Sequence, residues 1–340
     1  MVGTSDREGS TVKRTMTATL LAGVALGATI SAPASAADPV RVVAAGDIAC
    51  DPADPEFNGG RGSGLHCRQW ATAQAAQDQS PDLVLTLGDN QYEEGRRSSY
   101  RASFGRSWAA PFLDRDDPSA NRIWPVPGNH EYYTAGAAGY WSFFNGGTQS
   151  SPRSSGIAGT TNRGWYQRKA GGWQILALNS NCDQLGAAGC TRDSAQYRWL
   201  ARKLKGSSAR CTLAYWHHPR FTDGEHTDAV EMRPFWRLLD RYDAELVLSG
   251  HNHDYERFAP LDARGVASAD GVRQFVVGTG GKSLYAVQPN GGPAPAVFSD
   301  TTMGVLSLDL GRGSYSWRFV PASFPGNGAF TDTGSATCLP

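Results

Sequence analysis

Short apolar runs alternate with polar or glycine-containing turns along most of the chain. Seven of these runs are rich in Leu or β-branched residues and stop at a polar residue or a glycine. They read VRVVAAGD, PDLVLTLGD, RIWPVPGNH, WQILALNSN, CTLAYWHHP, AELVLSGHNH and RQFVVGTGG. Runs of this length and composition are typical of buried strands.

Helical patterns lie between several of the predicted strands, at residues 66–78, 193–205 and 228–242. Asp193 or Ser194 is a suitable N-cap for the second of them. Because strands and helices alternate, the sequence predicts an α/β fold in which the strands are largely buried.

The C-terminal part has little helix signal from about Phe275 onward, and the segments GVLSLDL and SYSWRFV predict further strands. No internal repeat or long linker interrupts the chain, so residues 37–340 are predicted to form a single domain. Of the 340 residues, 40% are hydrophobic and 19% are charged, which is enough for a sizeable core. Basic and acidic residues number 32 each, so we expect no nucleic-acid partner.

The N-terminal segment has the pattern of an export signal. Lys13 and Arg14 precede TMTATLLAGVALGATISAP, which ends near Ala34-Ser35-Ala36, a small-residue cleavage pattern. This predicts a signal peptide at residues 1–36 and a secreted mature protein. A membrane anchor is the alternative, but the apolar stretch falls short of the ~18 residues that a span needs. We therefore expect no anchor after cleavage.

Export makes the six cysteines informative, because an even number in an exported chain indicates disulfides. No CxxC pair is present, which argues against a zinc ribbon. The favoured pairs are the local ones, Cys50–Cys67 and Cys182–Cys190, which leave Cys211–Cys338. Other connectivities and free buried thiols remain alternatives.

Polar side chains gather just after the predicted strands. They are Asp47, Asp89 with Tyr92, Asn129 with His130, His217 with His218, and His251 with His253. In open α/β sheets this edge binds ligands. Carboxylates, imidazoles and an amide, without thiolates, suit hard or borderline transition metals. Each motif alone could be a turn or a helix cap, but their ordered occurrence predicts a site for two ions that share a carboxylate.

The ordered pattern GD…GDxxY…GNHE…H…GHxH resembles the calcineurin-like metallophosphoesterases, and in particular their purple acid phosphatase branch. The wider superfamily begins with Asp-x-His, whereas this chain has Ala49 in place of that histidine. The purple branch also lacks it and uses the tyrosine of GDxxY, here Tyr92. GHNHDYER is similar to that branch's GHxHxYER. The resemblance runs from residue 41 to about 282, without the N-terminal β-domain of the plant enzymes, as in the small secreted bacterial type.

The resemblance implies a four-layer α/β/β/α sandwich with two mixed sheets flanked by helices. It also implies two metal ions held by Asp47, Asp89, Tyr92, Asn129, His217, His251 and His253. Fe(III) would occupy the site of Asp47, Asp89, Tyr92 and His253. A divalent Fe, Zn or Mn would share Asp89 and bind Asn129, His217 and His251. His217 is favoured over His218 because the family's histidine comes directly before the x-Pro pair.

The implied activity is hydrolysis of phosphomonoesters by a metal-activated hydroxide. His130 would assist the leaving group, and His226, nine residues after His217, would contact the phosphate. The alternative interpretation of His226 is a solvated loop residue. The expected partners are small-molecule phosphate esters. The alternatives are a phosphodiesterase or nucleotide-cleaving enzyme with the same metals, and a non-catalytic phosphate- or metal-binding protein.

Two further motifs remain open at this level. GTGGKS, residues 278–283, resembles a phosphate loop, but Val276 stands where the first glycine is required and no helical pattern follows. It is interpreted as a glycine-rich loop at a strand end near the site. Tyr255 and Arg257, in the YER segment, could lie beside the metals or anchor a carboxylate, or could be purely structural.

Overall fold

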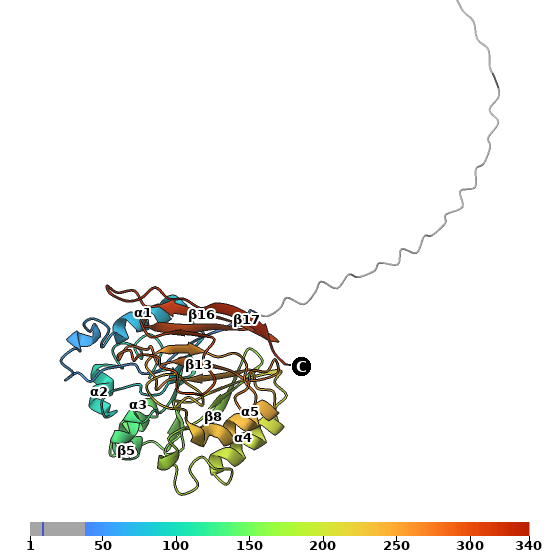
Figure 1. Cartoon of the computed structure of the whole chain (residues 1–340). Coiled ribbons are helices and arrows are strands. Elements are labelled where there is room, and N and C mark those ends of the chain that lie inside the picture. Colours follow the sequence, from blue (N-terminus) through green and yellow to red (C-terminus); the bar gives the residue numbers. More distant parts are fainter. Residues whose placement is uncertain (1–8, 10–37, 340) are drawn as a thin grey trace, which may run out of the picture. The chain divides into compact units, whose positions relative to one another are not determined.

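The computed structural model describes residue 9 and residues 38–339 (Figure 1). The predicted signal peptide, residues 1–36, lies outside the described residues apart from Gly9, and both it and the single-domain assignment stay predictions. Within the described part of the chain, no helix combines the length and the hydropathy needed to cross a bilayer.

The first large sheet has six strands and is mixed. Its order is β17 (Thr333–Thr337), β16 (Ser314–Pro321), β15 (Gly304–Leu310), β1 (Val40–Ala45), β2 (Leu83–Leu87) and β3 (Ile123–Val126). β1, β2 and β3 run parallel, with Val42 opposite Leu83. β15 pairs antiparallel to β1, with Val40 opposite Leu310. The predicted C-terminal strands therefore complete the sheet that begins with the first apolar run.

The second large sheet has seven strands and is also mixed. Its order is β14 (Val297–Ser299), β12 (Tyr255–Arg257), β13 (Arg273–Val277), β11 (Leu246–Ser249), β10 (Cys211–Tyr215), β9 (Trp173–Ala177) and β8 (Tyr166–Ala170). β9, β10, β11 and β13 are parallel to one another. All seven apolar runs are thus strands of the two sheets.

Helices cover the outer faces of the two sheets (Figure 1). They are α1 (Gln69–Asp78), α2 (Arg97–Ala102), α3 (Ala138–Phe144), α4 (Ala195–Lys205) and α5 (Arg233–Arg241). α1 packs on β15 and β16 of the first sheet, and α2 packs against α3. α4 and α5 pack together on the outer face of the second sheet. The predicted sandwich of two mixed sheets flanked by helices is confirmed.

Alternation along the strands of the second sheet produces its two faces. In β10, Leu213 and Tyr215 belong to the core shared with the first sheet. Ala214, between them, belongs to the separate core under α4 and α5, together with Leu200 and Phe235. Successive side chains of a strand point to opposite faces, so a strand buried on both sides reads as the continuous apolar run seen in the sequence.

Two predicted helices begin later than the sequence pattern indicated. α1 begins at Gln69 rather than residue 66, because the backbone N–H groups of Cys67 and Arg68 donate to the 278–283 loop instead. α5 begins at Arg233, with Pro234 in its first turn. Proline is favoured there since its missing N–H needs no partner in the first turn. The helix at 195–205 has the predicted N-cap, as Ser194 Oγ accepts from Tyr197 N at 3.1 Å.

Short elements were not predicted. α2 and α3 have six and seven residues, too few for a clear helical period. The sequence also gave no signal for edge strands β8, β14 and β17 or for two small hairpins, β4 (Gly147–Thr148) with β5 (Ser151–Pro152) and β6 (Ser155–Gly156) with β7 (Gly159–Thr160). Single 3₁₀ turns lie at Asn58–Gly60, Pro118–Ala120, His130–Tyr133, Ala135–Ala137, Cys182–Gln184 and Val230–Met232.

All three favoured disulfides are present, at Cys50–Cys67, Cys182–Cys190 and Cys211–Cys338. None of the described cysteines is free. The first anchors the loop before α1, the second closes the loop before α4, and the third joins the start of β10 to the C-terminal segment.

The parallel strands of both sheets end at the same edge of the sandwich. There the end of β1 bonds to the end of β13, with Gly46 N donating to Val277 O at 2.9 Å and Gly280 N donating to Gly46 O at 2.9 Å. The loop after β2 is bonded to the loop after β1, since Asp47 N donates to Gly88 O at 3.1 Å. The polar residues that follow these strands are therefore brought into one region.

Candidate metal centre

Three of the strand-end residues turn inward through strained backbone. Asp47, Asp89 and His251 have φ angles of 60°, 46° and 72°, in the left-handed region that non-glycine residues rarely adopt. Such conformations cost about 1–3 kcal/mol each and cluster at functional sites. Both carboxylates are also fully buried, or nearly so. The turns after β1, β2 and β11 thus aim these groups at one point at the expense of stability.

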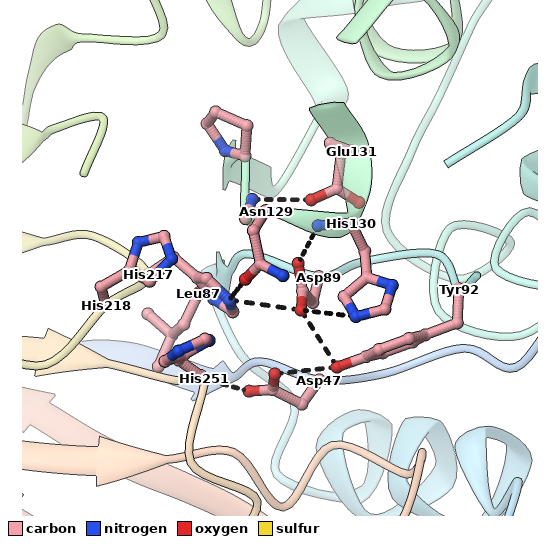
Figure 2. Close-up of polar contacts among 12 residues, drawn as sticks. Asp47, Leu87, Asp89, Tyr92, Asn129, His130, Glu131, His217, His218 and His251 are labelled. Carbon is pink, nitrogen blue, oxygen red and sulfur yellow. Dashed lines mark hydrogen bonds and ion pairs between the residues drawn. The ribbon is translucent and has the colours of Figure 1, made fainter. Parts of the chain in front are cut away.

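The Tyr92 hydroxyl lies where the first predicted set of ligands converges. Its oxygen is 3.0 Å from Asp47 Oδ1, 3.2 Å from Asp89 Oδ2 and 2.9 Å from His253 Nε2. Figure 2 shows the phenol pointing toward the two aspartates. The residue that distinguishes GDxxY from an ordinary strand-end turn therefore faces the other three members of its predicted site.

The second predicted set surrounds His217. Its Nε2 lies 3.3 Å from Asp89 Oδ2 and 3.1 Å from Asn129 Oδ1. Its Nδ1 is 2.8 Å from the carbonyl oxygen of Leu87, which can only accept, so Nδ1 carries a proton and Nε2 faces the centre (Figure 2). The His251 ring lies 5.0 Å from the His217 ring. Asp89 thus stands between the two predicted sets.

Burial and neighbouring charges shift the pKa values of several groups at this centre. Burial opposes ionisation of Asp89, but His217 and His130 hold its pKa well below the usual range. Burial lowers the pKa of His217, yet Asp89 and Asp47 outweigh burial and raise it to about 9. Burial, Asp47 and Asp89 together raise the pKa of Tyr92 well above its ordinary value. A phenolate at Tyr92 therefore requires added positive charge.

The donor set fits a pair of cations. Within the described residues, Asp47 and Asp89 form ion pairs with histidines only, and with no Lys or Arg. Buried charges are normally compensated, so this concentration of carboxylate and phenol oxygens favours a bound cation. Oxygen and imidazole donors suit hard or borderline ions. Glycine at position 128 also preserves the space, since a Cβ there would lie 2.1 Å from Asp89 Oδ1.

His130 lies at the rim of the centre rather than among the converging atoms. Its backbone N donates to Asp89 Oδ1 at 2.9 Å, and its Nδ1 lies 2.6 Å from the Glu93 carbonyl oxygen. Nε2 is 3.9 Å from Asp89 Oδ2. The ring packs between Tyr92 and Tyr133, with centroid distances of 4.3 and 4.8 Å. The carbonyl fixes Nδ1 as a donor and leaves Nε2 directed toward the centre.

His218 and His226 lie beside His251. His218 Nδ1 is 2.8 Å from Ser180 Oγ, and burial with the neighbouring His217 lowers the His218 pKa to about 3. His226 is exposed, and its ring stacks on the His251 ring at 4.3 Å and 23°. The structure thus brings His226 to the edge of the centre, while its exposure is equally that of a solvated loop residue.

Glu131 was missed in the sequence analysis, although it is the last residue of GNHE. It is fully buried and accepts from Gly128 N at 2.6 Å, Asn90 N at 3.0 Å and the Tyr100 hydroxyl at 2.8 Å. These bonds join the loops that carry Asp89 and Asn129. An acidic residue directly after two site residues was the available signal.

The 278–283 loop also contributes a residue that was not predicted. Ser283 Oγ lies 2.8 Å from His253 Nδ1 and so orients that ring. Lys282 forms ion pairs with Asp54, at 2.9 Å, and with Glu93. The interpretation of GTGGKS as a strand-end loop beside the site is confirmed, and its position directly after β13 was the signal for Ser283.

Tyr255 and Arg257 have structural roles. The Tyr255 hydroxyl donates to Asp332 Oδ2 at 2.7 Å, and Arg257 binds both oxygens of Asp332 at 2.6 and 3.1 Å. The Tyr255 ring packs on Phe319 at 4.6 Å in the core between the sheets. Of the open readings, the structure bears out anchoring of a carboxylate, here in a structural role.

Comparison with known proteins identifies the family. Residues 40–255 match the family model of the calcineurin-like phosphoesterases, which covers most of the chain and all of the strand-end motifs except the 278–283 loop. The chain belongs to the calcineurin-like phosphoesterase family. In this phosphoesterase the converging aspartates, asparagine and histidines all fall within the matched region.

Individual relatives indicate the branch. The chain is 24% identical to purple acid phosphatase 15 of Arabidopsis thaliana over 273 residues, covering 72% of the chain and 47% of the relative. It is 26% identical to an uncharacterised protein of Mycobacterium tuberculosis over 238 residues, covering 65% and 40%. The purple acid phosphatase PPD1 of yellow lupin seeds has a similar structure, with a TM-score of 0.64, 18% identity and coverage of 86% and 53%.

These relatives confirm the resemblance to the purple acid phosphatase branch and support a metal-dependent phosphoester hydrolase. The chain spans about two fifths to half the length of the curated relatives named above. The similarity to the lupin enzyme shows the fold. The phosphoesterase family implies a centre of two metals, whose elements these similarities do not identify.

Proposed function

We propose that this phosphoesterase is a secreted phosphatase with two metal ions that hydrolyses small-molecule phosphomonoesters. The observation that carries the proposal is the convergence of Asp47, Asp89 and His253 on the Tyr92 hydroxyl, within 3.2 Å. Three disulfides and the predicted signal peptide support an oxidising, extracellular location.

The residues present would hold two cations that share Asp89. Asp47, Tyr92 and His253 would complete the first site, and Asn129, His217 and His251 the second. A phenolate is a hard anionic donor, which favours Fe(III) in the first site over Zn or Mg. The second site, with an amide and two imidazoles, suits a divalent Fe, Zn or Mn. When bound, the pair supplies charge that neutralises the phosphate and lowers the pKa of water at the centre.

The chain's own groups orient the centre and handle the proton. Leu87 O and Ser283 Oγ fix the rings of His217 and His253 through their Nδ1 atoms. His130 is held at Nδ1 by the Glu93 carbonyl, so its protonated form presents the Nε2 proton toward the centre. We infer that this proton passes to the leaving alcohol. General acid catalysis of this kind contributes typically ~10²–10⁴-fold.

His226 has a smaller proposed part in this scheme. Its ring stacks on His251 and is exposed beside the centre, where it would contact the substrate phosphate. Its ring is partly covered by neighbouring groups, and this desolvation, together with His253, lowers its pKa below the ordinary value, so we expect a neutral hydrogen-bonding group at neutral pH.

Metal analysis with a visible spectrum of the purified protein tests the proposal. We expect two metals per chain, including iron, and a charge-transfer band that disappears in Tyr92→Phe while the protein remains folded. A colourless protein with two Zn or two Mn ions would refute the iron assignment and leave Tyr92 without its proposed role.

Kinetics test the reaction itself. The metal-loaded enzyme should hydrolyse aryl monoesters faster than bis-aryl diesters, and His130→Ala should lower kcat by ~10²–10⁴-fold. Preference for the diester would indicate a phosphodiesterase instead. Unchanged hydrolysis by His130→Ala would remove the proton-transfer role, and absence of hydrolysis with both metals bound would leave a binding protein.

A further inference from the structure

A cleft opens beside the candidate metal centre, and its shape and charge bear on the substrate; the inference drawn from it rests on the proposed phosphatase function. The cleft has a volume of about 670 Å³, within the range of small-molecule sites. Asn129 and His251, both predicted ligands, line it. A phosphate at the centre would therefore have its alcohol part in or near this cleft.

Apart from His218, the rest of the cleft wall comes from three segments that contain no predicted metal ligand. They are the 3₁₀ turn His130–Tyr133, the loop around Ser180–Gln184, and residues 227–231. The second loop is closed by the Cys182–Cys190 disulfide and is bonded to the centre's edge through Ser180 and His218. The disulfide and the Ser180–His218 hydrogen bond hold this part of the wall in place. A wall of fixed shape can favour ligands of one shape over others.

Two exposed apolar side chains lie in this wall. Tyr133 is 61% exposed and Val230 is 51% exposed, and they are two of only six large hydrophobic residues that are exposed in the described part of the chain. Both line the cleft, from different loops. The Tyr133 ring also packs at 4.8 Å from the ring of His130, so it lies next to the group proposed to protonate the leaving alcohol. A flat or apolar alcohol would cover this surface.

The charged residues of the wall have a single sign. Asp183, Asp228 and Glu231 line the cleft, and its lining within the described residues contains no Lys or Arg. Asp228 is compensated by Arg220, at 3.3 Å. Asp183 and Glu231 are exposed and form no ion pair among the described residues. A second anionic group on the substrate would lie near like charges, which oppose binding.

We propose that this cleft receives the alcohol part of the phosphomonoester and selects substrates with a single phosphate on an apolar, uncharged or cationic alcohol. Substrates with a second phosphate or a carboxylate on the alcohol are turned over poorly. Tyr133 supplies the apolar contact, and Asp183 with Glu231 supplies the discrimination against negative charge.

Para-substituted phenyl phosphates test the charge preference, because the ester chemistry stays nearly constant along the series. For the wild-type enzyme, we expect kcat/KM for phenyl phosphate to exceed that for 4-carboxyphenyl phosphate by about 5–20-fold, from like-charge repulsion in a partly solvated site. 4-(Aminomethyl)phenyl phosphate should equal or exceed phenyl phosphate. The difference should shrink at high salt, as exposed charges are screened.

Variants assign the effect to residues. Asp183→Asn with Glu231→Gln should raise kcat/KM for the carboxylated substrate relative to that for phenyl phosphate about 3–10-fold. Asp240→Asn with Asp243→Asn, at the far end of α5, is the matched control and should change neither. Tyr133→Ala should raise KM for phenyl phosphate about 3–10-fold, as expected for a lost aromatic contact, while Tyr133→Phe keeps it. Tyr242→Ala, an exposed tyrosine at the same far end, is its control.

Equal turnover of the three wild-type substrates, or no response to the Asp183 and Glu231 variants, would overturn the proposal. Failure of the proposed function is distinguishable, because it would appear as no hydrolysis of any of them. In that case, binding of phenylphosphonate and 4-carboxyphenylphosphonate to the metal-loaded protein still tests the cleft. We expect tighter binding of phenylphosphonate, and equal affinities would refute the selection.

Discussion

The two sheets supply different chemistry to one centre. Loops after strands of the first sheet carry the proposed oxygen donors, namely Asp47, Asp89, Tyr92 and Asn129. Loops after strands of the second sheet carry the proposed nitrogen donors, namely His217, His251 and His253. Neither sheet alone could form a site with both oxygen and nitrogen donors. The complete donor set therefore exists only while the two sheets stay packed in their native arrangement.

The two sides are also stabilised differently. On the oxygen side, buried Glu131 and backbone N–H groups join the loops to each other. On the nitrogen side, one backbone bond joins the loops of His217 and His251, with Gly250 N donating to His217 O at 3.0 Å. The His217 and His253 rings are each oriented at Nδ1 by one group, and for His217 that group is Leu87 O, from the first sheet. The first sheet is therefore the framework of the centre, since it supplies the group that orients His217, and the second sheet carries the rings.

Replacing the shared carboxylate should have the largest effect. If Asp89 is shared as proposed, Asp89→Asn should weaken both metal sites at once, and loss of several kcal/mol of charge stabilisation corresponds to a decrease in kcat of at least about 10³-fold. His251→Ala removes a proposed ligand of one site and should cost less. Asp309→Asn, on the first sheet but paired with Arg41, is the control. Equal losses from Asp89→Asn and His251→Ala would contradict the shared position of Asp89, as would two metals retained per chain.

Filling the space beside the oxygen donors should have the next largest effect. In Gly128→Ala the new Cβ would meet Asp89 Oδ1 at 2.1 Å, so the carboxylate must move. A displacement of about 1 Å can cost ~10²-fold in rate, and we expect a loss in kcat of that order. Gly206→Ala, after α4, meets only Arg202 O at 3.2 Å and should keep full activity. Activity of Gly128→Ala near that of the control would show that the oxygen side is not a tight framework.

The smallest effect is expected for replacement of Glu245, which lies just before β11, at the opposite end of this strand from the candidate metal centre. Burial raises the pKa of Glu245 to about 7 from an ordinary value of 4.5, although Thr212 N and Leu339 N donate to it. Between these pH values the folded state binds the proton more tightly than the unfolded state, so stability falls as the pH rises. Glu245→Gln should flatten this fall, by roughly 1–3 kcal/mol between pH 4.5 and 7.

Urea unfolding of the metal-loaded, disulfide-intact protein at both ends of this pH window measures that difference. Glu245→Gln also replaces one carboxylate oxygen, which accepts a backbone hydrogen bond, with an NH₂ group. The test therefore uses the change in the free energy of unfolding with pH and not its absolute value. An unchanged slope with pH would assign the pH dependence to other groups, and a changed kcat at neutral pH would mean that this end of β11 is coupled to the centre.

The sequence predicted the framework better than its edges. The seven apolar runs were recognisable because strands buried on both faces need no alternation, as in β10 with Leu213, Ala214 and Tyr215. α2 and the edge strands left no comparable pattern, because they are short and half exposed. The early helix start at residue 66 was wrong because bonds from Cys67 and Arg68 to a loop more than 200 residues away hold the chain there, and such contacts have no local signature.

The residues of the site were predicted from motifs, but their supports were not. Asp47, Asp89 and Tyr92 follow apolar runs, which marks them as strand-end residues. Glu131 and Ser283 act through neighbours brought together by the fold, so their importance depends on distances that the sequence does not contain. The cleft residues Tyr133 and Asp183 belong to no motif and became visible only as parts of one wall.

The Cys211–Cys338 disulfide has a consequence for the connectivity of the molecule. The covalent ring that it closes joins cysteines 127 positions apart and includes all three proposed nitrogen donors together with β15, β16 and β17 of the first sheet. A protease that cuts one exposed loop inside this ring opens the ring without releasing a fragment. After such a cut, the loops that carry the imidazoles and the three C-terminal strands of the first sheet would remain covalently linked. The two parts of a nicked chain therefore could not separate on dilution, and reassembly of the centre would not depend on protein concentration.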